Sequence, residues 1–384
     1  MNTYRIVIAG DLLPWHNNAA LFKKGDAESL FGKTIQNLFS ASDFSIINLE
    51  GPLTNSTVRQ EKIGPVIKAE PDTINGIKRL GVKCVALANN HITDYLHQGY
   101  MDTIETLNRT HIEYVGAGSN KENIRTHLSV TLGDKRLCIY NVSETFFNAP
   151  TMTSAGVNIY DEYRVCNEIR ELKSNHDYLI VIYHGGAEYF PYPTPQTRLR
   201  FHRMADCGAD FITAQHTHCI GCEEYYNGAY LLYGQGNFLF AKQTVKPMTK
   251  EGFVVEIIIG QDVKIVKHHV ELTEEACLKV SDFGQQREYD ERCMRIDDED
   301  YIIRQFEMLK PVNIIDRYLL AFKGKYSFTV GLKNIMPQKL WRKLLESYTR
   351  NQIMRNKFVL NSDRAREDIY YLWNHIAKNN GVFY

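Results

Sequence analysis

The sequence has no excess of charge of either sign and no long apolar run. Its 384 residues contain 45 Lys and Arg against 45 Asp and Glu, whereas proteins that coat nucleic acid carry a basic surface. We therefore expect no nucleic-acid partner. No apolar segment approaches the roughly 20 residues that a membrane-spanning helix needs. The first ten residues enter a β-branched apolar segment without the features of a signal peptide. These absences predict a cytoplasmic protein.

The sequence also lacks the cysteine pattern of a disulfide-stabilised protein. Eight cysteines are scattered along the chain, most of them inside apolar segments, where reduced cysteines behave as small hydrophobic residues. Cys219 and Cys222 form the one close pair and directly follow His218. A structural zinc site needs four ligands, however, and a second pair is missing. We interpret these cysteines as core residues.

What the sequence does contain is an alternation of strand and helix patterns over its first two-thirds. Hydrophobic residues make up 44% of the chain and aromatic residues 11%, which excludes a predominantly disordered protein. Helical patterns separate the apolar segments at residues 4–10, 44–50, 83–88, 178–183 and 210–214. Turn sequences between other segments predict three hairpins. This order predicts a layered α/β core with much parallel sheet.

The composition changes near residue 285. Residues 287–300 are dense in charge, and the sequence from there to residue 384 has helical periodicity. We interpret residues 1–284 as an α/β domain and residues 285–384 as a helical C-terminal appendage. Residues 337–357 combine an apolar stripe with a basic face. This pattern fits a helix on a membrane surface or a helix packed on the core, and we favour the second.

Residues with metal-binding side chains follow five of the apolar segments, where each predicted strand ends. In chain order they are Asp11, Glu50, Asn90 with His91, His184, and His216 with His218. Ligands of open α/β folds bind at the carboxyl ends of the strands, so we expect these side chains to meet at one edge of the sheet. Carboxylates, imidazoles and an amide oxygen are the donors of a mixed nitrogen and oxygen metal site.

Each of these residues also has an ordinary structural interpretation. An aspartate after a strand is commonly a turn or cap residue, and Asn90 and His91 could cap the following helix. Joint occurrence at five strand ends favours a single site instead. Asp94 follows His91 by three residues. It could orient the imidazole ring or cap the next helix, and the spacing alone leaves both interpretations open.

The order of these motifs resembles one known family. Asn-Leu-Glu-Gly-Pro-Leu-Thr, Ala-Asn-Asn-His, His-Gly-Gly-x-Glu, His-x-His and Tyr-Gly-x-Gly-Asn-Phe occur in this order between residues 4 and 240. The set is similar to that of the CapA family of poly-γ-glutamate capsule synthesis proteins. The resemblance implies a four-layer α/β/β/α sandwich of the calcineurin-like metallophosphoesterase type. It does not cover the helical C-terminal region.

The resemblance also implies a role for each residue. It makes Glu50 the bridge between two divalent metal ions (Mn, Fe or Zn), and His91 a general acid that Asp94 could orient. Two such ions can activate a hydroxide and neutralise developing charge, while an imidazole can protonate the leaving oxygen. The metal ligands that it implies are Asp11, Glu50, Asn90, His184, His216 and His218.

Three departures from the family pattern stand out. Leu13 occupies the position of a histidine in the first motif of typical phosphoesterases, which removes one ligand and implies a weaker ion beside Asp11. His16 could reach in from the following loop, although a surface position is the simpler interpretation. Leu96 stands where the family usually has glycine, which predicts a different loop. Family members are commonly exported or membrane-anchored, and this sequence shows neither signal.

These features predict a metal-dependent hydrolase of the phosphoesterase type, acting on a phosphoester or an anionic polymer in capsule or cell-surface polymer biosynthesis. The missing ligand at Leu13 keeps open a second hypothesis. In it the protein holds the polymer without cleaving it, as a component of a capsule-synthesis membrane complex. A third hypothesis, hydrolysis or transfer at a γ-glutamyl amide, uses the same two-metal chemistry. We expect a cytoplasmic location, with membrane association as the alternative.

Overall fold

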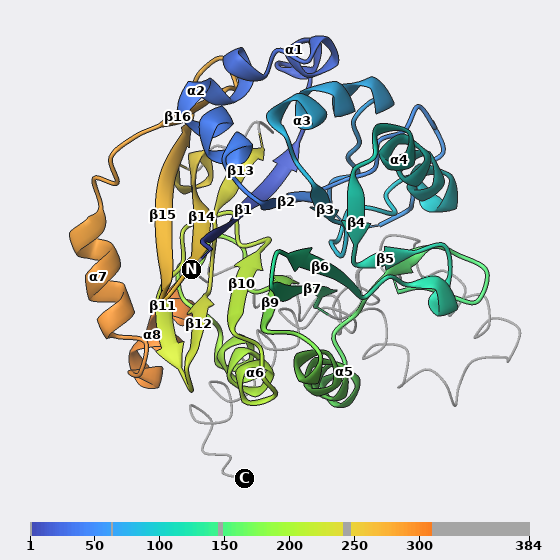
Figure 1. Cartoon of the computed structure of the whole chain (residues 1–384). Coiled ribbons are helices and arrows are strands. Elements are labelled where there is room, and N and C mark those ends of the chain that lie inside the picture. Colours follow the sequence, from blue (N-terminus) through green and yellow to red (C-terminus); the bar gives the residue numbers. More distant parts are fainter. Residues whose placement is uncertain (1, 63, 145–148, 241–246, 309–384) are drawn as a thin grey trace, which may run out of the picture. The chain divides into compact units, whose positions relative to one another are not determined.

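The structure, a computed structural model of the whole chain, describes residues 2–62, 64–144, 149–240 and 247–308 (Figure 1). The chain groups into two compact units, one made of Met1–Gln60 and Val66–Arg304, the other of Glu61–Pro65 and Gln305–Tyr384. All the candidate site residues belong to the first unit. The domain boundary between residues 284 and 285 stays a prediction, and residues 337–357 lie outside the described residues.

Two sheets form the centre of the first unit. The larger has eight strands in the order β16-β15-β14-β1-β2-β3-β4, and β13 pairs with β1 outside this path. β1 to β4 are parallel, while β14, β15 and β16 are antiparallel additions. The strands are β1 (Tyr4–Leu13), β2 (Phe44–Leu49), β3 (Cys84–Ala86), β4 (Glu113–Val115), β13 (Asn237–Phe240), β14 (Glu251–Ile259), β15 (Val263–Leu272) and β16 (Leu278–Val280).

The smaller sheet has six strands in the order β11-β12-β10-β9-β7-β6. Its edge strands β6 and β11 close two of the predicted hairpins, while the inner strands are parallel. A separate two-stranded sheet pairs β5 (Ala117–Gly118) with β8 (Gly156–Val157). The six strands are β6 (His127–Leu132), β7 (Lys135–Ser143), β9 (Tyr178–His184), β10 (Phe211–Gln215), β11 (Glu223–Tyr226) and β12 (Ala229–Leu232).

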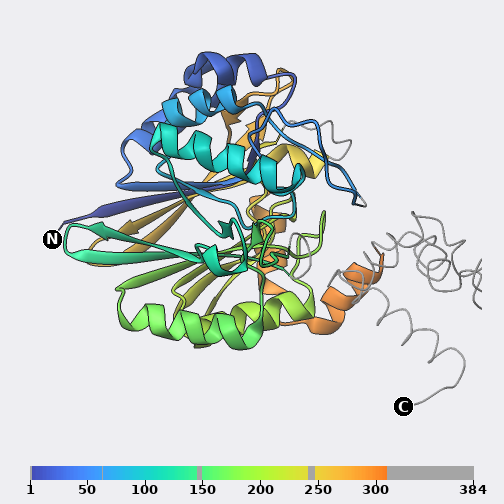
Figure 2. The same ribbon diagram turned by 90° about the vertical axis from the view of Figure 1, so that its right-hand side faces the viewer.

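Helices cover the outer face of each sheet, as Figure 2 shows from the side. The larger sheet carries α1 (Ala19–Lys24), α2 (Ala27–Ser40), α3 (Ile74–Leu80) and α4 (Leu96–Thr110). The smaller sheet carries α5 (Glu162–Ser174) and α6 (Pro195–Asp206). The predicted four-layer α/β/β/α sandwich is confirmed.

Burial along β1 explains the layering. Successive side chains of a strand point to opposite faces, and in β1 both faces are buried. Ile6 and Ile8 belong to the apolar cluster between the two sheets, together with Ile180 of β9. Val7 belongs instead to the cluster under the outer helices, together with Phe31 of α2. A strand that is apolar on both faces is typical of a central strand in an α/β fold.

Two further helices, α7 (Gln286–Met294) and α8 (Glu299–Met308), follow the sheets. Tyr289 of α7 is 1% exposed and belongs to the cluster between the sheets, so the predicted appendage contributes to the core from its first turns. Among the helices that the structure describes, none is long and apolar enough to span a membrane.

One prediction about the strands is wrong. We expected all five site-bearing strands to share the edge of one sheet, but β1, β2 and β3 belong to the larger sheet and β9 and β10 to the smaller. Apolar periodicity identifies buried strands without showing which of them pair. The side chains still meet, because the two sheets are stacked and the relevant strand ends lie close together.

Candidate metal centre

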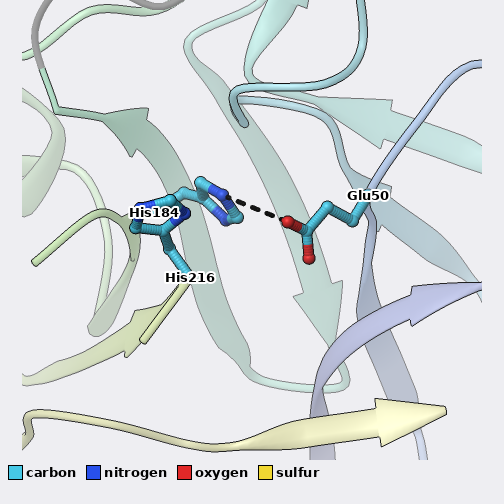
Figure 3. Close-up of side chains that lie close together, drawn as sticks. All are labelled: Glu50, His184 and His216. Carbon is cyan, nitrogen blue, oxygen red and sulfur yellow. Dashed lines mark ion pairs between the residues drawn. The ribbon is translucent and has the colours of Figure 1, made fainter. Parts of the chain in front are cut away.

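Glu50 lies at the centre of the candidate site. It is the first residue after β2, and its side chain is fully buried. Its Oε1 atom lies 3.9 Å from Nε2 of His184, 3.9 Å from Nε2 of His218 and 4.0 Å from Nε2 of His91. The close-up in Figure 3 shows His184 and His216 on the opposite side of the site from Glu50. Three imidazole nitrogens thus surround one carboxylate oxygen. Two of the histidines lie at or just after the ends of strands of the smaller sheet, and His91 follows a strand of the larger sheet.

Two overlapping groups of side chains have the geometry of a metal site. In each group one ligand atom per residue lies within 4.8 Å of all the others, and Glu50 belongs to both. Burial shields the groups from water, and carboxylate with imidazole is a donor set that suits first-row divalent cations. The residues therefore fit the implied cofactor. The groups are Glu50 with His184 and His216, and Asp11 with Glu50 and His218.

Asn90 stands beside the first group. Its Oδ1 atom lies 3.0 Å from Nε2 of His184. The same Nε2 atom faces Oε1 of Glu50. An amide oxygen is a neutral donor, so it can complete a ligand set without adding charge. All six residues that the sequence predicts as ligands are thus brought together in one region.

His91 and Asp94 form a closely spaced pair next to Glu50. Nδ1 of His91 and Oδ2 of Asp94 are 2.7 Å apart, and the same carboxylate oxygen accepts a hydrogen bond from the backbone N–H of Ile67. Helix α4 begins after Tyr95, which makes no side-chain cap. Of the two interpretations left open by spacing, the geometry therefore favours orientation of the His91 ring over helix capping.

Burial keeps His184 in the form that binds metals. The pKa of His184 is lowered well below its ordinary value, first by burial and then by the neighbouring rings of His216, His218 and His91. A low pKa means that the imidazole is neutral near pH 7. A neutral imidazole has a lone pair available for a cation.

The His-x-His segment has an unusual backbone. His216 and His218 have positive φ angles of 87° and 52°, a region that residues other than glycine seldom adopt. The backbone N–H of His216 donates to Oδ2 of Asp11. Such conformations persist where surrounding contacts impose them, and they gather at functional sites. Here the ring of His216 lies near Glu50, and that of His218 lies near both Asp11 and Glu50.

Two buried asparagines support the site, and the sequence reasoning missed them. Asn48 lies in β2, and its Nδ2 donates to Oδ1 of Asp11 at 2.8 Å. Asn89 donates to Oδ1 of Asn48 and accepts the backbone N–H of His91. The signal in the sequence is an amide side chain inside or beside a fully apolar strand, where each buried polar group needs a partner.

The departures from the family pattern can now be placed. Leu13 is 1% exposed and belongs to the apolar cluster under the outer helices, whereas His16 is exposed and packs edge-to-face on Trp15. Leu96 has a positive φ of 58°, which explains why glycine suits this position. Cys219 and Cys222 are both buried, in line with their interpretation as core residues.

Comparisons with known proteins agree with these motifs. The family model "Bacterial capsule synthesis protein PGA_cap" matches residues 5–242. The capsule biosynthesis protein CapA of Bacillus anthracis is 28% identical over 196 residues, which are 50% of this chain and 47% of that protein. The PGA biosynthesis protein CapA of Bacillus subtilis is 29% identical over 238 residues, which are 60% of this chain and 62% of that protein. The matches thus span about half to three-fifths of these relatives.

A solved structure described as a novel phosphatase from Mycoplasma pneumoniae is 15% identical, with a TM-score of 0.44, over 70% of this chain and 94% of that chain. The match to the family model covers most of the α/β core that carries the candidate site. The chain belongs to the bacterial capsule synthesis protein family PGA_cap.

Proposed function

We propose that this protein is a metal-dependent hydrolase of the phosphoesterase type that acts in the synthesis of a capsule or surface polymer. One observation carries the proposal. Glu50 belongs to two adjoining groups of metal-binding side chains, and the His91–Asp94 pair stands directly beside them. Two cations with an imidazole at their side are groups that can hydrolyse a phosphoester. The surface polymer enters the proposal through the printed names of the relatives.

The proposed ligand sets follow from the distances. Glu50, Asn90, His184 and His216 would hold one divalent ion, and Asp11, Glu50 and His218 a second, which is the weaker because Leu13 supplies no ligand. The ions, when bound, supply positive charge and an activated water. Mn, Fe and Zn all fit donors of this kind.

His91 performs the proton transfer in this proposal. Asp94 holds Nδ1 of the ring at 2.7 Å, which leaves Nε2 directed toward Glu50 at 4.0 Å. In the imidazolium form, which the Asp94 carboxylate stabilises, Nε2 carries a second proton and can give it to the leaving oxygen of a phosphoester bound beside Glu50, leaving a neutral ring protonated on Nδ1. General acid catalysis of this kind contributes about 10²- to 10⁴-fold to a rate.

The apolar burial of Leu13 favours a second candidate function. With one ligand missing, the same residues could hold a single ion and bind an anionic polymer without cleaving it, in a complex of the polymer-synthesis machinery. Cleavage or transfer at a γ-glutamyl amide would use the two-ion arrangement.

Elemental analysis of the purified protein, with an activity screen, separates these functions. The screen contains phosphomonoesters, phosphodiesters and poly-γ-glutamate, and it compares the wild-type protein with His91→Ala. Phosphoester turnover that needs metal and is lost in His91→Ala supports the proposal. Bound metal with polymer binding and no turnover of any substrate would support the second candidate, and amide cleavage would support the third.

A further inference from the structure

Asn237 is held beside Asp11 by a close approach of two backbone segments. It is the first residue of β13, and in the parallel pairing of β13 with β1 it lies opposite Asp11. A Cβ atom on Gly10 would lie 2.3 Å from the carbonyl oxygen of Gly236, and Gly236 has a φ of +72°. Glycine is therefore required at both positions, and the Gly10–Asp11 and Gly236–Asn237 pairs stand side by side. Asn237 is 5% exposed.

The hydrogen bonds of Asn237 determine which way its amide points. Its Nδ2 donates to the backbone carbonyl of Thr249 at 2.7 Å. Its Oδ1 must therefore be the atom 2.9 Å from Nδ1 of His218. An amide oxygen only accepts hydrogen bonds, so Nδ1 of His218 carries the hydrogen and donates it.

Aromatic contacts fix the plane of the same imidazole. The ring of His218 stacks on Phe240, with centroids 5.2 Å apart, and on Tyr189 at 6.0 Å. With the ring plane held, the tautomer decides which nitrogen offers a lone pair. Nε2 faces Oε1 of Glu50 at 3.9 Å, while Nδ1 lies 3.4 Å from Oδ2 of Asp11.

We propose that Asn237 is a positioning residue that fixes His218 as the Nδ1–H tautomer. In this role it takes the Nδ1 hydrogen away from Asp11, so that the Asp11 carboxylate stays available to a cation. It also leaves the Nε2 lone pair directed into the site. Partners of the second ring nitrogen commonly orient metal-binding histidines. A neutral amide does this without adding a third carboxylate to the Asp11 side. The importance of this tautomer for metal binding rests on the proposed function.

The tautomer is tested on metal-free protein by two-bond ¹H–¹⁵N NMR of ¹⁵N-histidine at pH 8, with His218→Gln to assign the signals. We expect a protonated Nδ1 in the wild type, a mixture of tautomers in Asn237→Ala, and the wild-type tautomer in Asn237→Asp, which keeps the acceptor. Asn18→Ala is the matched control, because Asn18 is also buried and also donates to a backbone carbonyl. It should leave His218 unchanged.

Calorimetric titration with Mn²⁺ is the second measurement. We expect Asn237→Ala to weaken the weaker binding step by about 10- to 100-fold, the usual effect of losing such a partner, and Asn237→Asp to weaken it less, because Asp keeps the acceptor for Nδ1 but loses the hydrogen bond to the Thr249 carbonyl. A wild-type His218 protonated on Nε2, or unchanged tautomer and affinity in Asn237→Ala, would overturn the proposal. If Asn237→Ala does not fold, the wild-type tautomer and the Asn237→Asp titration decide. Absence of any metal binding by the wild type would refute the proposed function and leave the tautomer result standing.

Discussion

The two halves of the candidate metal centre are built on different principles. The half with His184 and His216 has four donor side chains when Asn90 is included, and a lowered pKa keeps His184 neutral. The half with Asp11 has three donors, but amide side chains hold Asp11 and His218 in place. In the proposed centre, one half would gain metal affinity from the number of donors and the other from their orientation. Ligand count and ligand orientation are therefore separable contributions in this molecule.

Substitution of Glu50, which both halves share, should have the largest effect on metal binding and turnover. Glu50→Gln keeps the size of the side chain and removes the charge that both halves use, so we expect both metal-binding steps and all turnover to be lost. Elemental analysis and titration calorimetry measure this. Glu256→Gln is the control, because Glu256 is also a buried glutamate and pairs with Arg5 rather than with the site. Two bound ions in Glu50→Gln would contradict the shared-carboxylate arrangement.

Single histidine substitutions should affect the two metal-binding steps separately. We expect His184→Ala to remove the tighter binding step and His218→Ala to remove only the weaker one, because the donors of each half are distinct apart from Glu50. Titration of metal-free protein with Mn²⁺ and Zn²⁺ gives the two affinities. If the two variants lost the steps in the opposite order, orientation would outweigh donor number.

Substitution of His91 should leave both halves intact. We expect His91→Ala to keep its metal content and to lose turnover by about 10²- to 10⁴-fold, the contribution typical of a general acid. Asp94→Asn should give a smaller loss, because the His91 ring keeps a hydrogen-bonding neighbour. Metal analysis and kinetics on the same samples are needed. A parallel loss of metal in His91→Ala would make His91 a ligand.

Adding a donor to the half that contains Asp11 tests whether donor number limits its metal affinity. Leu13→His restores the histidine of typical phosphoesterases, and we expect the two metal affinities to move closer together. Leu13 is 1% exposed in an apolar cluster, so an imidazole there should lower the free energy of unfolding by about 1–3 kcal/mol. Urea unfolding and calorimetry measure the two effects. Unchanged affinities would mean that residue 13 is directed away from the ion.

The smallest effect is expected at His16. This residue is exposed and packs on Trp15, so His16→Ala should change neither binding step. A weakened second step in the same titration would show that the loop after β1 supplies a ligand.

The sequence predicted the strands, and which candidate donors lie close together, better than the arrangement of the strands in the two sheets. Residues such as Asp11, Glu50 and His184 follow apolar segments, and this local pattern is visible without a structure. The division of the strands between two sheets depends on which strands pair, and some partners are as distant in the sequence as β1 and β13.

The roles of the supporting asparagines also could not be predicted from local sequence patterns. The sequence marks Asn48 as an amide within an apolar strand and Asn237 as part of a motif, but which groups they support, Asp11 and His218, is known only from their contacts. Leu96 was noticed because it departs from a family pattern, and its positive φ supplies the physical reason for that pattern. Motifs thus identify candidate donors, whereas the partners that orient those residues depend on tertiary contacts.

The pairing of β1 with β13 has a consequence for the order of assembly during synthesis. Asp11 accepts a hydrogen bond from His216, a residue 205 positions later in the chain, and Asn237 follows later still. A ribosome must therefore translate most of the α/β core before the centre can close, and contacts of such long range form slowly. A cation would meet only isolated donors on the nascent chain. If the protein has the proposed function, metal loading would be coupled to completion of the fold and would report that the two ends of the core have paired.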